Sequence, residues 1–288
     1  MFPADPKTLP PDLADLLRFY ADAGVDEALG EDAVDRFAEV AAQPAAPPAR
    51  PQAARQAPHQ SSGAERATPA AQSPRPAPAL AVPDEAQAAK ARELARQART
   101  LEELRDILDG FDGCNLKFTA KQTVFSDGNP RAPLMLVGEA PGRDEDIKGK
   151  PFVGRSGQLL DRMLAAIGIE RASGAYIANV IPWRPPGNRT PTPLETEICR
   201  PFIERQIELV NPRVLVTLGG PSAKVVLNAT DGVLKLRGKW QAHTTASGVE
   251  IPAMPTLHPA YLLRNPAHKK LAWRDFLEIR AKLDTLGG

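Results

Sequence analysis

Four short apolar runs separated by helical stretches constrain the possible fold more than any other feature of this sequence. The runs lie near residues 134–138, 176–181, 214–218 and 253–257, and a charged helical stretch at 85–108 precedes the first of them. Alternating strands and helices favour a mostly parallel sheet with helices on both faces. We therefore predict an α/β fold, a three-layer αβα sandwich around a central, mostly parallel four-stranded sheet.

Local signals predict where two of the helices begin. Ser156 is a candidate N-cap for the helix after the first strand, because apolar residues follow it at helical spacing. Thr192 and Glu195 form a capping box with Pro193 at the first helical position. Pro201 should kink or break the helix that starts there.

The chain changes character before this α/β region. Residues 1–42 contain helical periodicity and are interpreted as a small N-terminal helical segment, either a dispensable cap or a docking module for a protein partner. Residues 43–84 are Pro/Ala-rich, with 23 of 42 positions being Pro or Ala. Such a segment buries too little apolar surface to offset the entropy of ordering, so we expect a disordered linker. The remaining region, 85–288, is predicted to be the functional domain.

Composition narrows the compartment and the type of partner. A formal net charge of +1 says little about nucleic-acid binding, because local basic patches matter more than the total. Two cysteines, Cys114 and Cys199, cannot form a disulfide framework and indicate a reducing compartment. The N-terminus lacks the pattern of a signal peptide, and no apolar run reaches the ~20 residues that span a bilayer. We expect a cytoplasmic protein that does not enter the membrane and is a monomer.

Three loops should meet in one crevice. Ligands of parallel α/β sheets bind at the carboxyl ends of the strands. That rule brings together the loop 138–142 after the first strand, the loop 181–189 after the second and the stretch 258–264 after the last.

The first of these loops, GEAPG, places Glu139 directly after a strand. It is neither a Walker loop nor a GxGxxG turn, since no GK[ST] follows it and its glycine spacing differs. Taken alone, it could be an ordinary turn between a strand and a loop. The nearby GRSG likewise fails the GxSxG nucleophile pattern.

The third stretch, HPAYLLRNPAHKK, has the composition of a loop that grips DNA. His258 is followed by apolar residues and then by cations, and no acid occurs between Ile251 and Arg274. Cations bind phosphates and an apolar side chain can wedge into the base stack. RPPGNR at 184–189 adds two arginines to the same crevice. The alternative is a solvated basic surface. Four scattered histidines offer no metal-ligand spacing, and the deaminase pattern is absent, so we expect no catalytic metal.

Taken together, these stretches resemble the family-4 uracil-DNA glycosylases over roughly residues 110–283. The resemblance rests on five blocks in the family's order: GEAPG with RDEDIKGKPFVGRSGQLLDRML, YIANVI, RPPGNRTP, CRPFIERQIELVNPRVLVTLGG, and HPAYLLRNP. It implies a repair enzyme that flips uracil out of DNA and hydrolyses its N-glycosidic bond to leave an abasic site. We also expect a monofunctional reaction, because no lysine occurs at a position where this family carries catalysis, and one that needs no divalent metal.

The resemblance assigns roles to the matching residues. Glu139 would stabilise the sugar cation or align water, and His258 would donate a hydrogen bond to uracil O2. Asn179 would pair with the uracil edge, and Phe152 would stack on the ring. The family places Glu145 among the catalytic residues. The bland alternatives are a turn residue for Asn179, a core aromatic for Phe152 and a solvated acid for Glu145.

The remaining site residues fall into two groups. Small or rigid residues would let the nucleotide approach the backbone: Gly138, Ala140, Pro141 and Gly142. DNA contacts are expected from Arg155, Ser156, Arg184, Arg189, Leu262, Leu263, Arg264, Lys269 and Lys270.

One departure from the family pattern concerns its iron–sulfur cluster. The family holds a [4Fe-4S] cluster with four cysteines, whereas two of those positions here are Phe111 and Trp183, leaving Cys114 and Cys199. We expect no cluster and no cofactor, because such a cluster normally needs four ligands. The aromatic side chains should fill the space that a cluster would occupy, or else lie on the surface.

Two other functions remain open from the sequence. The chain could be a DNA-binding or scaffold protein that retains the groove without the chemistry. It could also be a glycosylase for another deaminated or mispaired base.

Overall fold

The sheet and its surrounding helices are described by a computed structural model that covers residues 85–287. The N-terminal helical segment expected at 1–42 and the linker expected at 43–84 lie outside the described residues. Those two expectations therefore remain predictions.

The central sheet has six strands in the order β1-β3-β2-β4-β6-β5. Its strands are β1 (Asp127–Gly128), β2 (Leu134–Gly138), β3 (Ala175–Asn179), β4 (Val214–Leu218), β5 (Gln241–Thr244) and β6 (Glu250–Thr256). The four predicted strands are confirmed as the parallel centre β3-β2-β4-β6. The prediction of four strands in total is wrong, because β1 and β5 pair antiparallel at the two edges.

The edge strands escaped prediction because their sequences are short and polar. β1 has two residues, and only His243 of β5 is buried. Neither segment shows the continuous apolar run by which a buried parallel strand is recognised.

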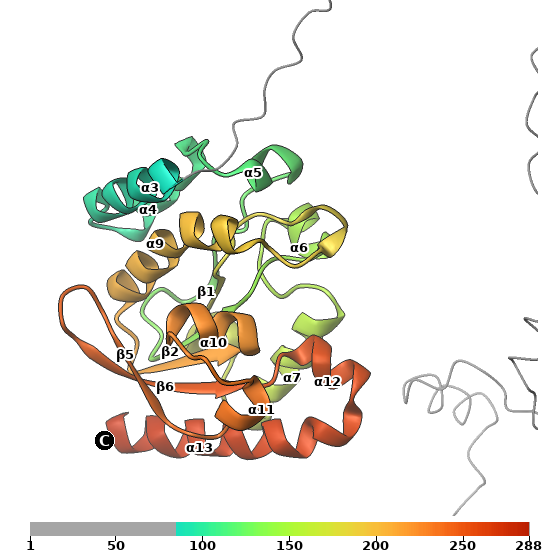
Figure 1. Ribbon diagram of the computed structural model, residues 1–288. Helices are drawn as coiled ribbons and strands as arrows, with labels where there is room; N and C mark the ends of the chain where they lie inside the picture. The colour runs from blue at the N-terminus through green and yellow to red at the C-terminus, as the bar shows by residue number, and fades with distance from the viewer. Residues whose placement is uncertain (1–84, 288) are drawn as a thin grey trace, which may run out of the picture. The chain divides into compact units, whose positions relative to one another are not determined.

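Helices cover both faces of the sheet, which confirms the predicted sandwich (Figure 1). The helix α13 (Lys269–Gly287) packs with α7 (Arg155–Ala166) on one face. The other face carries α9 (Pro193–Val210), against which α3 (Glu85–Gln97) and α4 (Leu101–Gly110) pack. The two apolar layers use alternate residues of each strand, as in β2, where Leu134 and Leu136 face α13 and Met135 and Val137 face α9.

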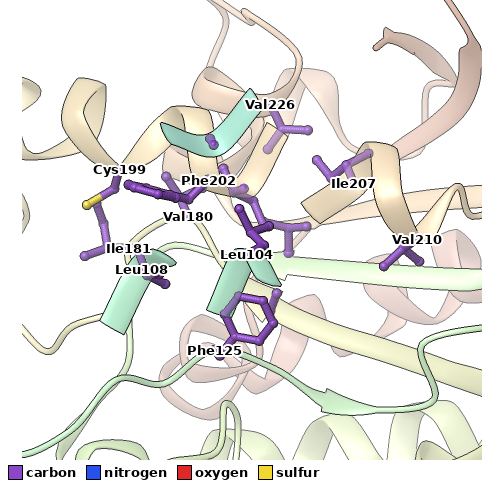
Figure 2. Close-up of a cluster of buried hydrophobic side chains, with 14 of the residues drawn as sticks. Leu104, Leu108, Phe125, Val180, Ile181, Cys199, Phe202, Ile207, Val210 and Val226 are labelled. Atoms are coloured by element: carbon purple, nitrogen blue, oxygen red, sulfur yellow. The ribbon is translucent and has the colours of Figure 1, made fainter. Parts of the chain in front are cut away.

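Figure 2 shows part of the core between α9 and the sheet. Leu104 and Leu108 of α4 meet Phe202 and Ile207 of α9 here, with Cys199 at the margin of the same cluster. The charged α3–α4 region is thus an integral layer of the domain.

The remaining elements are short and mostly border the sheet. They are α5 (Asn115–Thr119), α6 (Arg143–Lys148), α8 (Arg171–Gly174), η1 (Pro186–Asn188), α10 (Gly220–Val226), α11 (Val233–Leu236), α12 (Pro259–Arg264) and η2 (Pro266–His268).

The predicted helix signals were partly right. The capping box of α9 is confirmed, with the Thr192 hydroxyl accepting the Glu195 N–H at 3.2 Å and the Glu195 carboxylate accepting the Thr192 N–H at 2.7 Å. The prediction that Ser156 is an N-cap is wrong, because α7 already begins at Arg155 after the N-cap Gly154.

The helix α9 continues through Pro201 to Val210, so this proline does not break it. Proline removes one backbone hydrogen bond, but α9 packs against α3 and α4 and buries residues on both sides of Pro201. Conversely, the single charged helix expected at 85–108 is two helices, because Thr100 caps α4 by accepting the Glu103 N–H.

Among residues 85–287, no helix is both long enough and apolar enough to cross a membrane.

Candidate functional site

The three predicted loops meet in one pocket of about 530 Å³ at the carboxyl ends of the parallel strands. Glu139 follows β2, Asn179 ends β3 and His258 lies just beyond β6, and all three line the pocket. The parallel register of the strands brings these loops together, as the strand-end rule predicts.

Glu139 has the environment of a carboxylate held for chemistry. It is half-buried at the pocket wall, and burial raises the pKa of its carboxyl above the ordinary value. Its backbone carbonyl accepts the Ile181 N–H at 2.9 Å, which ties the loop to the strand next to it. The backbone of Glu139 is thereby held at a fixed point of the pocket.

Gly138 shapes the pocket without lining it. A Cβ atom added there would lie 2.4 Å from Asn179 Oδ1 and 2.6 Å from Phe152 Cζ. Any other residue would displace the amide, the ring or both. The lining of the loop itself comes from Ala140, Pro141 and Gly142.

Asn179 carries a buried acceptor that lacks a hydrogen-bond partner. Its side chain is 6% exposed, and its Oδ1 is one of four buried side-chain atoms without a partner among the described residues. Of these four atoms, only Asn179 Oδ1 belongs to a residue that lines the pocket. An unsatisfied buried polar group costs about 1–3 kcal/mol, so this amide is suited to a ligand that carries a donor.

Phe152 presents its ring to the pocket from a strained backbone. The residue is 4% exposed and has φ of 53°, in the left-handed region, which costs a residue other than glycine ~1–3 kcal/mol. Its ring lies 5.5 Å from that of His258, centroid to centroid, with 33° between the planes. The two rings form one side of the pocket.

His258 is held in one tautomer by the start of a helix. It is the N-cap of α12, and its Nδ1 accepts the Ala260 N–H at 3.1 Å. Burial, together with the charge of Arg264, lowers the pKa of His258 to about 4. The imidazole is therefore neutral near pH 7, and its Nε2 carries the proton that it can donate.

Glu145 is buried rather than solvated, which excludes one of the alternatives. Its Oε1 accepts the N–H groups of Val153 and Gly154, both at 2.9 Å, and its Oε2 accepts the Gly142 N–H at 3.1 Å. These contacts join the GEAPG loop to the loop that carries Phe152. Glu145 lines the pocket, but its oxygens are engaged by backbone amides.

The prediction that Leu262 contacts DNA is wrong. Its side chain is 1% exposed and packs with Leu159, Leu257 and Ala272, so it cannot reach DNA. The neighbouring Leu263 is half-buried and remains accessible.

The expected cations fall into two classes. Arg184 donates to Asn188 Oδ1 at 2.7 Å and lies 4.0 Å from Asp146, and Arg189 makes a two-bond ion pair with Glu195. Four other cations are exposed and have no carboxylate partner among residues 85–287: Arg155, Arg264, Lys269 and Lys270. Arg264, Arg189 and Ser156 line the pocket.

The sequence also left one wall of the pocket unassigned. It is lined by Leu218, the last residue of β4, and by Gly219, Gly220 and Pro221 directly after it. The same strand-end rule could have found them, because β4 is parallel to its neighbours. Gly219 has φ of 98°, and a Cβ there would lie 3.2 Å from His258 Cβ.

The four positions that the resemblance matches to iron–sulfur cysteines lie in one hydrophobic core and are named here the aromatic–thiol cluster: Phe111, Cys114, Trp183 and Cys199. All four side chains are buried, which excludes the alternative that the aromatics lie on the surface. The two Sγ atoms are 3.9 Å apart, and burial raises the pKa of the Cys199 thiol.

The aromatic members of this cluster are packed into the core. The Phe111 ring lies 5.2 Å from that of Phe202 on the Cys199 helix, and Trp183 Nε1 donates to Thr123 Oγ1 at 3.2 Å. Within residues 85–287, no three His, Cys, Asp or Glu side chains are grouped to hold a metal. Two thiols beside two aromatic rings do not fit a cluster that needs four ligands.

Comparison with known proteins agrees with this geometry. Residues 125–277, more than half of the chain, match the family model described as the Uracil DNA glycosylase superfamily. The chain is 41% identical over 170 residues to a protein of Archaeoglobus fulgidus named "Type-4 uracil-DNA glycosylase", covering 58% of this chain and 84% of that protein.

Two further relatives carry the same name. The protein of Sulfurisphaera tokodaii is 38% identical over 189 residues, covering 63% of this chain and 84% of its own length. That of Thermotoga maritima is 39% identical over 178 residues, covering 59% of this chain and 88% of its own length.

Proposed function

Because the chain belongs to the uracil DNA glycosylase superfamily, we propose a mechanism in which the pocket at the strand ends binds a flipped uracil and Glu139, Asn179 and His258 act on it. The protein is a uracil-excising DNA repair glycosylase, an enzyme that hydrolyses an N-glycosidic bond and leaves an abasic site. We propose a role for each of the pocket residues.

One observation carries the proposal: three groups of complementary chemistry share a single pocket. They are a carboxyl of raised pKa at Glu139, a buried unpartnered amide at Asn179 and a neutral donor at His258. Breaking the bond leaves positive charge on the sugar and negative charge on the departing base. An anion and a donor on different loops suit these two charges.

The base is recognised before the bond breaks. Asn179 Oδ1 accepts the N3–H of uracil, and its amide nitrogen donates to O4, so the buried acceptor gains the partner that it lacks. Phe152 stacks on the ring. Cytosine presents the opposite donor and acceptor pattern at N3 and the 4-position, and it leaves the amide unmatched.

The leaving base receives its stabilisation from His258. The Nε2–H of the neutral imidazole donates to uracil O2 as negative charge builds there, because Nδ1 is already occupied by Ala260. A neutral donor stabilises the anion without having to lose a proton. Glu139 on the opposite side stabilises the sugar cation and aligns the attacking water.

Glu145 acts as a positioning residue. Its three hydrogen bonds to backbone amides hold the loop of Glu139 and the loop of Phe152 at a fixed separation. It touches no reacting atom in this proposal.

DNA is gripped along the edge of the pocket near α7 and α12. The unpaired cations Arg155, Arg264, Lys269 and Lys270 bind phosphates, and Leu263 replaces Leu262 as the apolar wedge. Arg184 and Arg189 are engaged with side chains of the protein, so they stiffen the 184–189 loop that borders the pocket.

The reaction is monofunctional and independent of metal. No lysine is among the described residues that line the pocket, so a Schiff-base step that would cut the strand has no evident nucleophile. The enzyme works as a cytoplasmic monomer. A fragment beginning at residue 85 retains the activity, and residues 1–42 serve a protein partner.

A labelled oligonucleotide with one uracil tests the proposal. The protein is incubated with it, the product is treated with alkali, and the strands are separated on a gel. Cleavage only after alkali is expected. Cleavage of thymine or hypoxanthine substrates in place of uracil would assign another lesion, and binding without cleavage would reduce the protein to a DNA-binding scaffold.

A further inference from the structure

Arg171, a residue outside the pocket, hydrogen-bonds to the backbone of Phe152, whose ring lines the pocket. Arg171 begins the short helix α8, and its guanidinium faces the backbone of the loop that carries Phe152. Its Nη1 donates to the Phe152 carbonyl at 3.0 Å, and its Nη2 donates to the Pro151 carbonyl at 2.5 Å. Arg171 is not among the residues that line the pocket.

Two carboxylates fix the guanidinium in this place. Arg171 Nε donates to Asp127 Oδ2 at 2.8 Å, and its Nη1 donates to Asp161 Oδ1 at 2.9 Å. The Arg171 side chain is 17% exposed. Burial favours the neutral form of Asp127, but hydrogen bonds from Arg171 and Lys150 outweigh it and lower the pKa of that carboxyl. The Asp127 carboxylate is therefore charged near pH 7, and the guanidinium is held by hydrogen bonds at both Nε and Nη1.

The loop between Arg171 and the pocket cannot relax to an ordinary conformation without moving the ring. Phe152 has φ of 53°, which L-residues avoid. On the far side, Glu145 holds the N–H groups of Val153 and Gly154. Arg171 holds carbonyls and Glu145 holds amides, so the backbone on either side of the strained residue is fixed.

Gly157 makes room for this arrangement. A Cβ atom at that position would lie 1.9 Å from the Phe152 carbonyl oxygen. The helix α7 therefore approaches the strained residue closely, and the carbonyl that Arg171 binds lies in the narrow space between the helix and the loop.

We propose that Arg171 is a positioning residue for uracil excision, which keeps Phe152 in the left-handed conformation that turns its ring toward the base. This inference rests on the proposed function. Arginine is required because one planar guanidinium serves two carbonyls and two carboxylates at once, whereas the single ammonium of lysine cannot match that set.

A double-mutant cycle on uracil-containing DNA tests the proposal. Arg171→Ala should lower kcat/KM by between about 5-fold and 150-fold, the range produced by losing one stack between a base and an aromatic ring. In a Phe152→Ala background the same change should lower it by less than about 2-fold more, because the ring through which Arg171 acts is gone. Effects that multiply in full in the double variant would overturn the proposal.

Inhibition by free uracil distinguishes a positioning role from a general loss of stability, because a loss of stability alone does not change the inhibition constant of the folded protein. The inhibition constant for uracil should rise in Arg171→Ala, while affinity for DNA that contains an abasic site stays unchanged. Arg280→Ala is the matched control, since it removes an exposed Arg280–Asp284 ion pair on α13, and both constants should stay as in the wild type. Equal losses in the two Arg→Ala variants would overturn the positioning role.

Arg171→Lys tests the proposal if Arg171→Ala is not properly folded, as judged by the absence of cooperative unfolding. Arg171→Lys keeps a positive charge beside Asp127 and Asp161 but loses the planar guanidinium. It should therefore lower kcat/KM and raise the inhibition constant for uracil, each by less than Arg171→Ala does. Full activity of Arg171→Lys with normal uracil inhibition contradicts the proposal. Absence of uracil release by the wild-type protein would instead contradict the proposed function itself.

Discussion

The pocket at the strand ends and the aromatic–thiol cluster differ in the kind of side chain that they bury. The pocket keeps polar groups whose burial is costly: an unpartnered amide at Asn179, a carboxyl of raised pKa at Glu139 and a neutral imidazole at His258. The aromatic–thiol cluster holds Phe111 and Trp183, which pack into the core, at two positions where the resemblance expects metal ligands.

This difference separates what the reaction requires from what the fold requires. Buried polar groups without partners lower stability, so they persist where a ligand completes them. A metal cluster that only supports the fold can be replaced by apolar side chains that fill the same space, because voids are also costly. We infer that the chemistry of this enzyme depends on the pocket and that the aromatic–thiol cluster supplies packing.

The largest expected effect lies in the pocket. Glu139→Gln keeps the shape of the side chain and removes the charge, so kcat should fall by about 10²–10⁴-fold. The melting temperature should not fall, since burial already disfavours the charged form. Single-turnover uracil release measures the effect, and Glu197→Gln, an exposed acid of α9, is the control. Wild-type rates in Glu139→Gln would remove Glu139 from the reaction.

The aromatic–thiol cluster should respond in stability rather than in activity. Trp183→Ala should destabilise the protein by about 3–5 kcal/mol, because it empties a large buried volume. Trp273→Ala, which removes an exposed tryptophan from α13, should change stability by no more than about 0.5 kcal/mol. Denaturant unfolding compares the two, and at temperatures where both are folded each should release uracil at the wild-type rate. A slower uracil release by folded Trp183→Ala would show that the pocket depends on the aromatic–thiol cluster.

Base recognition should show an intermediate effect. Asn179→Asp keeps an acceptor for uracil N3–H and replaces the donor to O4 with a charge, so excision should weaken by ~1–3 kcal/mol. Asn211→Asp at the exposed C-cap of α9 serves as the control. Unchanged uracil kinetics in Asn179→Asp would show that this amide does not read the base.

The pH dependence should be small above neutral and fall on the acid side. His258 has a folded-state pKa of about 4, below its ordinary value, so it stays neutral as pH falls from about 8 to 5. Burial raises the pKa of Glu139, so Glu139 is the first of the two to lose its working form. We expect kcat/KM to be level near neutral pH and to decline as Glu139 takes up a proton. A rise in activity between pH 7 and 5 would mean that a charged histidine is needed.

The depressed pKa of His258 also makes the folding stability depend on pH. A histidine of depressed pKa binds fewer protons when folded, so its contribution is complete above the unfolded value near 6.5 and is lost as pH falls toward 4. His258→Asn should therefore flatten the decline of unfolding free energy over that window. Denaturant titrations at several pH values measure it.

The sequence was informative where local pattern and chemistry coincide and silent where long-range packing decides. Apolar runs located the four central strands, and the strand-end rule brought the loops of Glu139 and His258 together. Asn179 was assigned only through the family resemblance, because the expected strand at 176–181 ran past the observed end of β3. The two-residue strand β1 has no periodicity to detect. Leu262 and Leu263 could not be distinguished, because the six-residue helix α12 is too short to show which side faces the core.

Contacts distant in sequence were beyond prediction for the same reason. Arg171 lies in a four-residue helix, and its partners come from three segments distant in sequence from it: Asp127, the pair Pro151 and Phe152, and Asp161. Glu145 looked like one acid in an acidic stretch, and only the fold brings the amides of Val153 and Gly154 to its carboxylate.

The independence of the pocket from any metal cluster is tested most directly by measuring uracil release and iron content on the same purified protein in EDTA. We predict full uracil excision from colourless protein without stoichiometric iron, because Phe111 and Trp183 cannot ligate it. Activity that rises and falls with the amount of bound iron would contradict this prediction.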